Sequence, residues 1–369
     1  MIEALHSLEI EAFKCFERLR VPLAPLTLLT GFNGAGKSST LQPLLLLAQA
    51  ARANVWGTGT LDGDLPLNGD LVRLGSAGDV LNVSSSASVS RFRVGAGENV
   101  LDVVLTARTG ERTLRAECGA PSDAGDIPAR LRRLVYLSAV RGGPSDTFPI
   151  PARSAGTVPD VGADGRYASY WYHEFADADI SPEKCLDGGS ADTFRRQVDA
   201  WLDRLAPGAN ANVQALAVAS LNVLQFRLSQ TGEWRRPANV GYGLTYSFPI
   251  LVALLAAERG DIVVIDSPEA HLHPQAQSRM GRMLATFAAA GVQILVETHS
   301  DHVLNGARLA VRDGVLTPEK VSLLFFSGVS SSGHGVTTPR LDMNGRIDEW
   351  PDGFFDQGDK DVSSLAGWD

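Results

Sequence analysis

A glycine-rich segment from Gly31 to Ser39 constrains this chain more than any other feature. It reads Gly-Phe-Asn-Gly-Ala-Gly-Lys-Ser-Ser and follows an apolar run over residues 26–30, which matches the phosphate-binding pattern G-x-x-x-x-G-K-[ST]. Glycines let consecutive backbone N–H groups curl around a phosphate, and a helix from about residue 37 to residue 47 directs its positive dipole end toward the same group. Lys37 then supplies a positive charge and Ser38 a hydroxyl for Mg²⁺. The sequence therefore predicts a nucleoside triphosphate site formed by Gly31, Asn33, Gly34, Ala35, Gly36, Lys37, Ser38 and Ser39.

Two further apolar runs end in polar residues that suit the same site. Residues 261–266 are typical of a buried parallel strand, and Asp266 at its carboxyl end is predicted to hold Mg²⁺ opposite Ser38. Residues 292–297 form another such run, which Thr298-His299-Ser300 follows. Because ligands of open α/β sheets bind at the carboxyl ends of the strands, we expect His299 to reach a γ-phosphate as a hydrogen-bond donor. A solvated acid and a surface histidine are the structural alternatives, and the order of the three segments favours the site.

These segments, together with Ser267-Pro268-Glu269-Ala270-His271-Leu272-His273-Pro274, resemble the motifs of ABC-type ATPase heads. The likeness is greatest to the bacterial branch of overcoming-lysogenization-defect ATPases and of RecF-like and chromosome-maintenance heads. Residues 344–357 resemble a narrower family of standalone bacterial ATPases that carry a C-terminal domain of unknown function. The resemblance implies an α/β P-loop NTPase fold with a mixed sheet core, a β-rich lobe and a helical or loop insertion. It also implies that the protein binds ATP and Mg²⁺, and residues 300–369 leave no room for the nuclease domain of overcoming-lysogenization-defect proteins.

The resemblance further implies a head that works as a homodimer on ATP, or as a higher oligomer, with nucleotide held between protomers. A glycine-led helix of one protomer then caps the γ-phosphate bound by the other. The segment that fits is 239–245, in which Gly241 and Gly243 allow close backbone approach and Thr245 offers a hydroxyl. We expect a helix over residues 248–257 behind it, with Pro249 in the opening turn. A glycine turn before a core helix remains the structural alternative.

One departure from the resemblance concerns the base that activates water. Most ABC heads carry a glutamate directly after the acid at the end of the second strand, and here that position is Ser267. Serine is a poor base at its ordinary pKa. Glu269 is the nearest replacement, so we predict Glu269, His299 and Lys37 as the catalytic residues. The alternative is slow hydrolysis by a nucleotide-gated switch.

His271 and His273 form an H-x-H pair just beyond Glu269. His273 falls where other heads place an aspartate between protomers, so we expect it at the dimer interface. A metal site at this pair is the weaker interpretation, because the segment offers no further ligands.

Charge and cysteine usage limit the partners and the compartment. A net charge of −9 argues against coating of nucleic acid by bulk charge. Contact with DNA or RNA through a local basic cluster remains open, and a solvated surface is the alternative interpretation of each cluster. The clusters are Arg130, Arg132 and Arg133; Arg195 and Arg196; and Arg235 and Arg236. The three cysteines lack C-x-x-C spacing, which favours a reducing compartment. No signal peptide or bilayer-spanning apolar run is evident, so we expect a cytoplasmic protein without a membrane partner.

The chain is predicted to form a single ABC-type head over residues 1–369. We expect the nucleotide-binding core in residues 1–50 and 236–335, a β-rich lobe in 51–140, an insertion in 141–235 and a family-specific segment in 336–369. Residues 131–139 predict a buried strand. Arg141, just after this run, is either a sensor of nucleotide or partner or an arginine that anchors a loop, and the sequence leaves both open.

Two functions agree with these observations. The first is a Mg²⁺-dependent ATPase that dimerises on ATP and drives or times a bacterial DNA-related process, such as antiphage defence together with a separate effector subunit. The second is a nucleotide-gated scaffold or sensor that hydrolyses little ATP and holds or releases a toxic effector. The intact set of predicted site residues favours the first, and Ser267 favours the second. Absence of the Leu-Ser-Gly-Gly-Gln signature argues against the ATPase subunit of a transporter.

Overall fold

The structure is a computed structural model that describes residues 3–53, 55, 62–82, 88–108, 110–119, 121–152, 158–186, 193–330 and 333–367. Its central element is a six-stranded sheet in the order β15-β14-β3-β13-β12-β8. All neighbours in this sheet are parallel except β14 and β15, which form an antiparallel pair. The strands are β3 (Leu26–Gly31), β8 (Val135–Leu137), β12 (Ile262–Asp266), β13 (Gln293–Glu297), β14 (Val321–Ser330) and β15 (Gly333–Thr337).

Both faces of this sheet are buried, which explains the uninterrupted apolar runs of its inner strands. Side chains alternate across a strand, so Ile262 and Val264 of β12 pack into one hydrophobic cluster while Val263 and Ile265 pack into the other. Helices α1 (Lys37–Arg52) and α3 (Ile127–Arg133) contribute to the first cluster. Helices α6 (Tyr242–Ala256), α7 (Pro274–Ala289) and α8 (Asp301–Arg312) contribute to the second.

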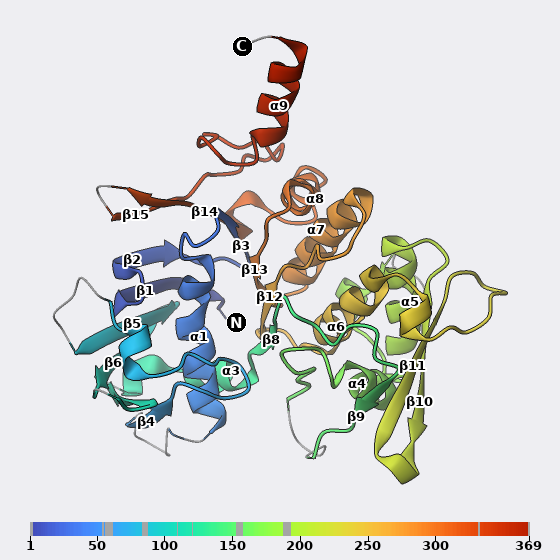
Figure 1. The fold of residues 1–369 in the computed structure, drawn as a ribbon, viewed down its shortest axis with the longest axis horizontal. Helices are drawn as coiled ribbons and strands as arrows, with labels where there is room; N and C mark the ends of the chain where they lie inside the picture. Colours follow the sequence, from blue (N-terminus) through green and yellow to red (C-terminus); the bar gives the residue numbers. More distant parts are fainter. Residues whose placement is uncertain are drawn as a thin grey trace.

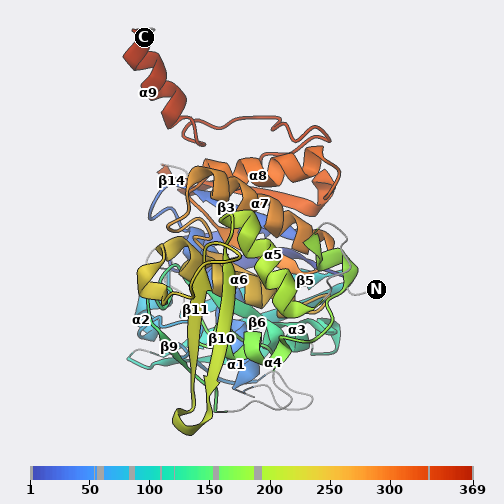
Figure 2. The same ribbon diagram turned by 90° about the vertical axis from the view of Figure 1, so that its right-hand side faces the viewer.

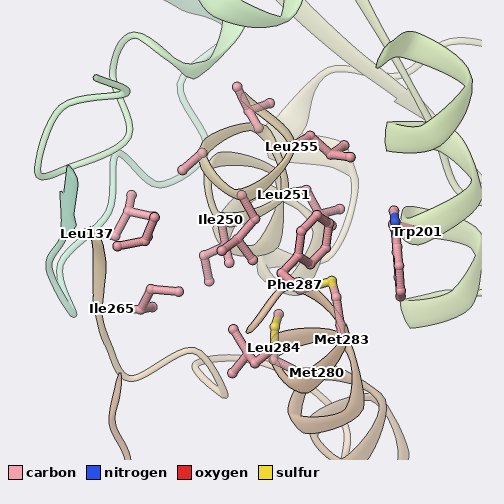
Figure 3. Packing of buried hydrophobic residues seen from close by; sticks show 14 of the residues in the cluster. Leu137, Trp201, Ile250, Leu251, Leu255, Ile265, Met280, Met283, Leu284 and Phe287 are labelled. Carbon is pink, nitrogen blue, oxygen red and sulfur yellow. The ribbon is translucent and has the colours of Figure 1, made fainter. Parts of the chain in front are cut away.

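The second cluster shows how α6 is held between sheet and helices. Figure 3 shows Ile250, Leu251 and Leu255 of α6 among residues from the sheet, from α7 and from α5 (Phe194–Leu205). Trp201 of α5 contacts Phe287 of α7 with ring centroids 5.4 Å apart. Helix α6 is therefore packed on several sides, which fixes its N-terminus at the carboxyl edge of the sheet. The residues labelled around it are Leu137, Ile265, Met280, Met283, Leu284 and Phe287.

A second, antiparallel sheet forms the β-rich lobe beside α1 (Figure 1). Its strand order is β2-β1-β5-β6-β7-β4, so it includes two strands from residues 1–50, the segment that the sequence assigned to the nucleotide-binding core. The strands are β1 (Leu5–Phe13), β2 (Phe16–Pro22), β4 (Gly63–Pro66), β5 (Val89–Ala96), β6 (Asn99–Ala107) and β7 (Thr113–Cys118). Short helices α2 (Ala77–Val80) and η1 (Pro121–Ala124) complete the lobe.

The insertion and the C-terminal segment lie outside the two large sheets. Strands β10 (Asn210–Leu216) and β11 (Leu221–Arg227) form a long hairpin, seen in Figure 2, which pairs with β9 (Thr147–Pro149). Helix α9 (Gln357–Ala366) projects away from the body of the molecule (Figures 1 and 2). The remaining elements are α4 (Ala168–Phe175), η2 (Pro182–Lys184), η4 (Ala217–Ala219), η5 (Pro237–Asn239) and η6 (Pro318–Lys320).

Two predicted elements differ in the structure. The predicted strand over residues 131–139 is wrong at its start, because residues up to Arg133 belong to α3, whose Ile127 and Leu131 lie one turn apart and are both buried. Helix α6 begins at Tyr242 rather than near residue 248, so Pro249 lies inside the helix. Pro249 lacks an N–H group, and its ring instead packs closely on Gly165. None of the helices in the described ranges combines the length and apolarity needed to cross a bilayer.

Candidate nucleotide-binding site

The predicted phosphate-binding loop leaves β3 and enters α1. Gly31, Gly34 and Gly36 have φ values of 124°, 73° and 105°, in the left-handed region that glycine adopts without a Cβ penalty. Gly31 also lies so close to β14 that a Cβ atom there would be 2.2 Å from the carbonyl oxygen of Phe326. The loop glycines are thus required by backbone geometry, and buried Ala35 completes the turn between Gly34, which is exposed, and Gly36, which is partly buried.

Lys37, the first residue of α1, is 4% exposed. Its Nζ donates to the carbonyl oxygens of Gly31 at 3.0 Å and of Phe32 at 2.8 Å, so the amine lies inside the loop that it would serve. Burial lowers the pKa of Lys37, and the carboxylates of Glu297 and Asp266 oppose this shift. The lysine therefore faces two acids at the ends of adjacent strands, as a phosphate site with a bound cation requires.

A carboxylate that sequence reasoning missed, Glu297, lies beside Asp266. Parallel pairing of β12 and β13 places Asp266 opposite Glu297, the last residue of each strand. The Oγ of Ser38 donates to Glu297 Oε1 at 3.0 Å, whereas Asp266 Oδ1 accepts from the hydroxyl of Ser267 at 2.8 Å. Burial raises the pKa of Glu297, and nearby Asp266 raises it further. The sequence does contain one signal for Glu297: it ends the apolar run 292–297 just as Asp266 ends the run 261–266.

The surroundings of Ser38 and Asp266 fit a Mg²⁺ ion. A cavity of about 160 Å³ is lined by Ser38, Asp266, Glu297 and Gln42, among others. The Oε1 atom of Gln42 is shielded from solvent and accepts no hydrogen bond from the described part of the chain. Hydroxyl, carboxylate and amide oxygens are the ligands that hard divalent cations prefer. Ser38 and Asp266 would hold the ion, as the sequence predicted.

Glu269 is fixed against the turn that carries His299. Its Oε2 accepts from the hydroxyl of Thr298 and its Oε1 from the backbone N–H of His299, both at 2.8 Å. His299 is exposed at the carboxyl edge, and its pKa is lowered by partial burial and by the charge of Lys37. Glu269 and Asp266 act on His299 in the opposite direction. The structure thus gathers Lys37, Asp266, Glu269 and His299 at one edge of the sheet.

The turn between Asp266 and Glu269 is held in a costly conformation by Arg141. Ser267 has a φ of 51°, a left-handed value that is unfavourable for residues other than glycine. Arg141 is buried and donates to the carbonyl oxygens of Asp266 at 2.9 Å and of Ser267 at 2.6 Å. It also lies over the ring of Tyr246, and burial lowers its pKa to about 10. Of the two roles left open by the sequence, these bonds support the arginine that anchors a loop.

The predicted signature segment forms the start of α6. Gly241 is the N-cap residue, and a Cβ atom on Gly243 would lie 2.9 Å from the carbonyl oxygen of His271. Tyr242 is 50% exposed beside these glycines. Thr245 is buried, and its hydroxyl donates to the carbonyl oxygen of Tyr242 at 2.9 Å. The role of Thr245 toward a partner's nucleotide stays a prediction, and it requires this hydroxyl to leave its bond inside the helix.

The two histidines after Glu269 have separate structural contacts. The His271 ring lies 5.2 Å from that of Tyr242 and 4.7 Å from that of Tyr246, measured between centroids. His273 is the N-cap residue of α7, and its Nδ1 accepts from the N–H of Gln275 at 3.3 Å. Within the described ranges no group of three or more histidine, cysteine or acidic side chains is arranged to hold a metal.

The C-terminal segment packs against the phosphate-binding loop. Phe32 contacts Phe325 of β14 at 6.0 Å between ring centroids, and a Cβ atom on Gly353 would lie 2.5 Å from Phe32 Cζ. Phe354 is 1% exposed, and its ring contacts that of Phe325 with centroids 5.2 Å apart. A cavity of about 350 Å³ lies between this segment, Phe32 and His299. The segment therefore borders the candidate site, which the sequence did not predict.

Several arginines of the basic clusters make contacts within the chain. Arg130 is buried and donates to the carbonyl oxygens of Glu3 and Gly260. Arg133 forms an ion pair with Asp261 at 2.6 Å. Arg130 and Arg133 therefore make contacts within the protein, and we no longer consider these two side chains candidates for contact with nucleic acid.

Comparisons with known proteins agree with this fold. Residues 148–305 match a family model described as "AAA domain, putative AbiEii toxin, Type IV TA system", and residues 316–365 match "Protein of unknown function (DUF3696)". A solved SmcHead bound to the C-winged helix domain of ScpA superposes with a TM-score of 0.54 at 13% identity, over 92% of this chain and 98% of that one. A Pyrococcus furiosus Smc head domain with an extended coiled coil, bound to the C-terminal domain of ScpA, gives a TM-score of 0.54 at 12% identity, over 99% and 100%. No curated protein gives a significant match.

The chain shares the fold of these Smc head domains, so the predicted fold class is confirmed. The chain is similar to AAA ATPase domains over the region that carries β12, Glu269 and His299, and to the DUF3696 segment at its C-terminal end. The C-terminal resemblance noted from residues 344–357 is thereby confirmed as well.

Proposed function

We propose that this protein is a Mg²⁺-dependent ATPase that dimerises on ATP and drives or times a bacterial DNA-related process, namely antiphage defence together with a separate effector subunit. The observation that supports this function best is the convergence of Lys37, Asp266, Glu269 and His299 on one edge of the sheet. Each group comes from a different element or turn, so chance assembly of the full set is improbable.

Each residue has a role in hydrolysis. The loop N–H groups and Lys37 bind the β- and γ-phosphates, and His299 donates to a γ-phosphate oxygen. Glu269 accepts a proton from water as the water oxygen bonds to the γ-phosphorus. The bond from this phosphorus to the bridging oxygen breaks, and ADP leaves with the electron pair. Mg²⁺, when bound by Ser38 and Asp266, neutralises charge on the phosphate oxygens.

Dimerisation is supported by the N-terminus of α6. Gly241 and Tyr242 are exposed there, and the helix of 15 residues presents its positive dipole end toward solvent. A negative γ-phosphate held by a second protomer would be stabilised at this position. His273, exposed at the start of α7, remains our prediction for a contact across the same interface.

The proposed biological setting draws on the matched descriptions. The description of the AAA family model names a "putative AbiEii toxin, Type IV TA system". We infer that this chain supplies the nucleotide-dependent part and that a separate effector supplies the other.

Steady-state ATP hydrolysis across a range of protein concentrations tests the enzymatic function. The wild type is compared with Glu269→Gln and with Glu174→Gln, which alters an exposed glutamate of α4. Turnover per chain rises with concentration if the site is shared between protomers. Loss of a general base lowers turnover by about 10²-fold or more, so Glu269→Gln should be nearly inactive and Glu174→Gln normal. Equal and measurable turnover of the wild type and Glu269→Gln contradicts the role of Glu269 as base, and absence of turnover in the wild type contradicts the ATPase.

A nucleotide-gated scaffold is the second candidate, and Ser267 favours it. The hydroxyl of Ser267 is bonded to Asp266, so the position next to the cation ligand holds no free base. Both Glu269 oxygens also accept hydrogen bonds from the His299 turn. Tight ATP binding without turnover in the same assay would select this function.

A further inference from the structure

Glu297 is a buried acid that the proposed hydrolysis does not use. It is 7% exposed and ends β13 directly opposite Asp266. An ionised carboxylate is costly to bury unless it is paired or binds a metal. The Ser38 hydroxyl that donates to it is neutral, and the positive charge of Lys37 faces both Glu297 and Asp266. Two adjacent carboxylates therefore share one lysine at this sheet edge, which leaves negative charge for a divalent cation to balance.

Gln42 gives an independent observation at the same place. It lies one helical turn after Ser38 on α1, on the same helix face. Its Oε1 atom is excluded from solvent and has no hydrogen-bond donor in the described ranges. A buried amide oxygen without a donor destabilises the folded protein. The cavity that Gln42 lines is the one that also holds Ser38, Asp266 and Glu297.

The cavity has the size and chemistry of a hydrated cation site. Its volume of about 160 Å³ admits an ion with several waters. Arg73 and Tyr136 also line the cavity, so water and phosphate oxygens find donors there as well. Mg²⁺ usually keeps several waters and binds through one or two carboxylates, which this donor set provides.

We propose that Glu297 and Gln42 complete the divalent-cation site of Ser38 and Asp266, so that the protein binds the cation through its own oxygens before nucleotide arrives. The inference rests on the proposed function for the location of the cation, and it adds a second carboxylate and an amide oxygen to the two predicted ligands. Glu297 also holds the Ser38 hydroxyl in position, so it acts as both a positioning residue and a ligand of the ion or its waters.

Binding of Mn²⁺ in the absence of nucleotide tests this inference. Manganous chloride is titrated into the protein, and free Mn²⁺ is measured by electron paramagnetic resonance. The wild type should show one site per chain that is tighter than the binding by scattered surface acids. Glu297→Gln keeps the size of the side chain and removes its charge, and it should weaken that site by about tenfold or more. The control Glu319→Gln alters an exposed glutamate of η6 and should leave it unchanged.

A second variant distinguishes loss of a cation ligand from a folding defect. Gln42→Met removes the amide oxygen while keeping a side chain of similar length, and it should weaken the same site by a smaller factor. Thermal unfolding of each variant shows whether it is folded. Wild-type Mn²⁺ affinity in both folded variants overturns the inference.

Binding of a fluorescent ATP analogue in the presence of Mg²⁺ separates this inference from the proposed function. Loss of Mn²⁺ binding in Glu297→Gln, with no binding of the analogue by the wild type, supports the cation site and contradicts the ATPase. Binding of the analogue by the wild type but not by Lys37→Ala, with unchanged Mn²⁺ affinity in Glu297→Gln, overturns the cation site and leaves the ATPase standing.

Discussion

The Thr298 hydroxyl donates a hydrogen bond of 2.8 Å to Glu269 Oε2, and this bond orients the predicted base from a neighbouring strand end. Thr298 is fully buried, and its Oγ1 also accepts from the N–H of Ser300 at 3.1 Å. The threonine therefore connects the turn after β12 to the turn that carries His299. Glu269 is therefore oriented by this connection in addition to the turn that Arg141 holds.

Thr298→Val should lower turnover while nucleotide binding persists. Valine has the shape of threonine without the hydroxyl, so Glu269 loses one of its two orienting bonds. A misplaced catalytic group typically costs about 10²-fold in rate, and a loss of tenfold to a hundredfold in kcat is expected. Thr27→Val, at another fully buried threonine of β3, is the control and should keep its rate. An unchanged kcat in Thr298→Val would show that the bond does not position the base.

Gly31→Ala should destabilise the protein more than Gly34→Ala. Both glycines have positive φ, which costs an L-residue roughly 1–2 kcal/mol. Only Gly31 adds a clash, because its Cβ would lie 2.2 Å from a backbone oxygen of Phe326, whereas nothing lies within 4 Å of a Cβ on Gly34. Urea unfolding should therefore show a loss of about 1 kcal/mol for Gly34→Ala and about 3 kcal/mol for Gly31→Ala. Equal losses would contradict the close packing of loop and β14.

Asp199 should make stability depend on pH between about 4 and 6. Burial raises its pKa to about 6 from 3.8, against the opposing charges of Arg227 and Arg195. In this window the folded protein binds more protons than the unfolded chain. The stabilisation that protonated Asp199 contributes is therefore complete below pH 3.8 and is lost as the pH rises through 6. Each pKa unit corresponds to about 1.4 kcal/mol before screening by solvent.

Asp199→Asn removes the titrating group and keeps the oxygen that accepts from the N–H of Ala211. The variant should show a flatter curve of unfolding free energy between pH 4 and 6 and a higher stability than the wild type at pH 7. The control is Asp203→Asn, at an exposed aspartate of α5 whose Oδ1 accepts from the backbone N–H of Gly208. A wild-type pH dependence in Asp199→Asn would assign the effect to another group.

Gly353→Ala should weaken nucleotide binding from outside the phosphate-binding loop. Gly353 has a φ of 80°, and a Cβ there would press on Phe32 at 2.5 Å. We expect the contact to be relieved by a shift of the Phe32 ring, which is 49% exposed and belongs to the loop. Titration with a fluorescent ATP analogue should show a weaker Kd, by about tenfold for a loss near 1.4 kcal/mol. Gly367→Ala has a similar φ of 70° with open space around it, and its Kd should match that of the wild type.

Much of the fold followed from local patterns. The loop between residues 31 and 39, the strand that ends at Asp266 and the strand that ends at Glu297 all lie where the apolar runs predicted them. The start of α6 and the end of α3 were misjudged, because tertiary packing of Pro249 and Leu131 outweighed local preference. Glu297 was missed because its run indicates only a buried strand, and its partner Ser38 is 259 residues away.

The sequence by itself determined the phosphate-binding loop, because the left-handed glycines and the lysine that follows them form one contiguous unit whose backbone geometry depends on few other residues. Tertiary structure decided which side chains complete the site. The parallel register of β12 and β13 places Asp266 beside Glu297. The turn at Thr298 orients Glu269, and the C-terminal segment packs against Phe32. These contacts join residues far apart in the chain, and only the burial of both faces of the sheet fixes their relative positions.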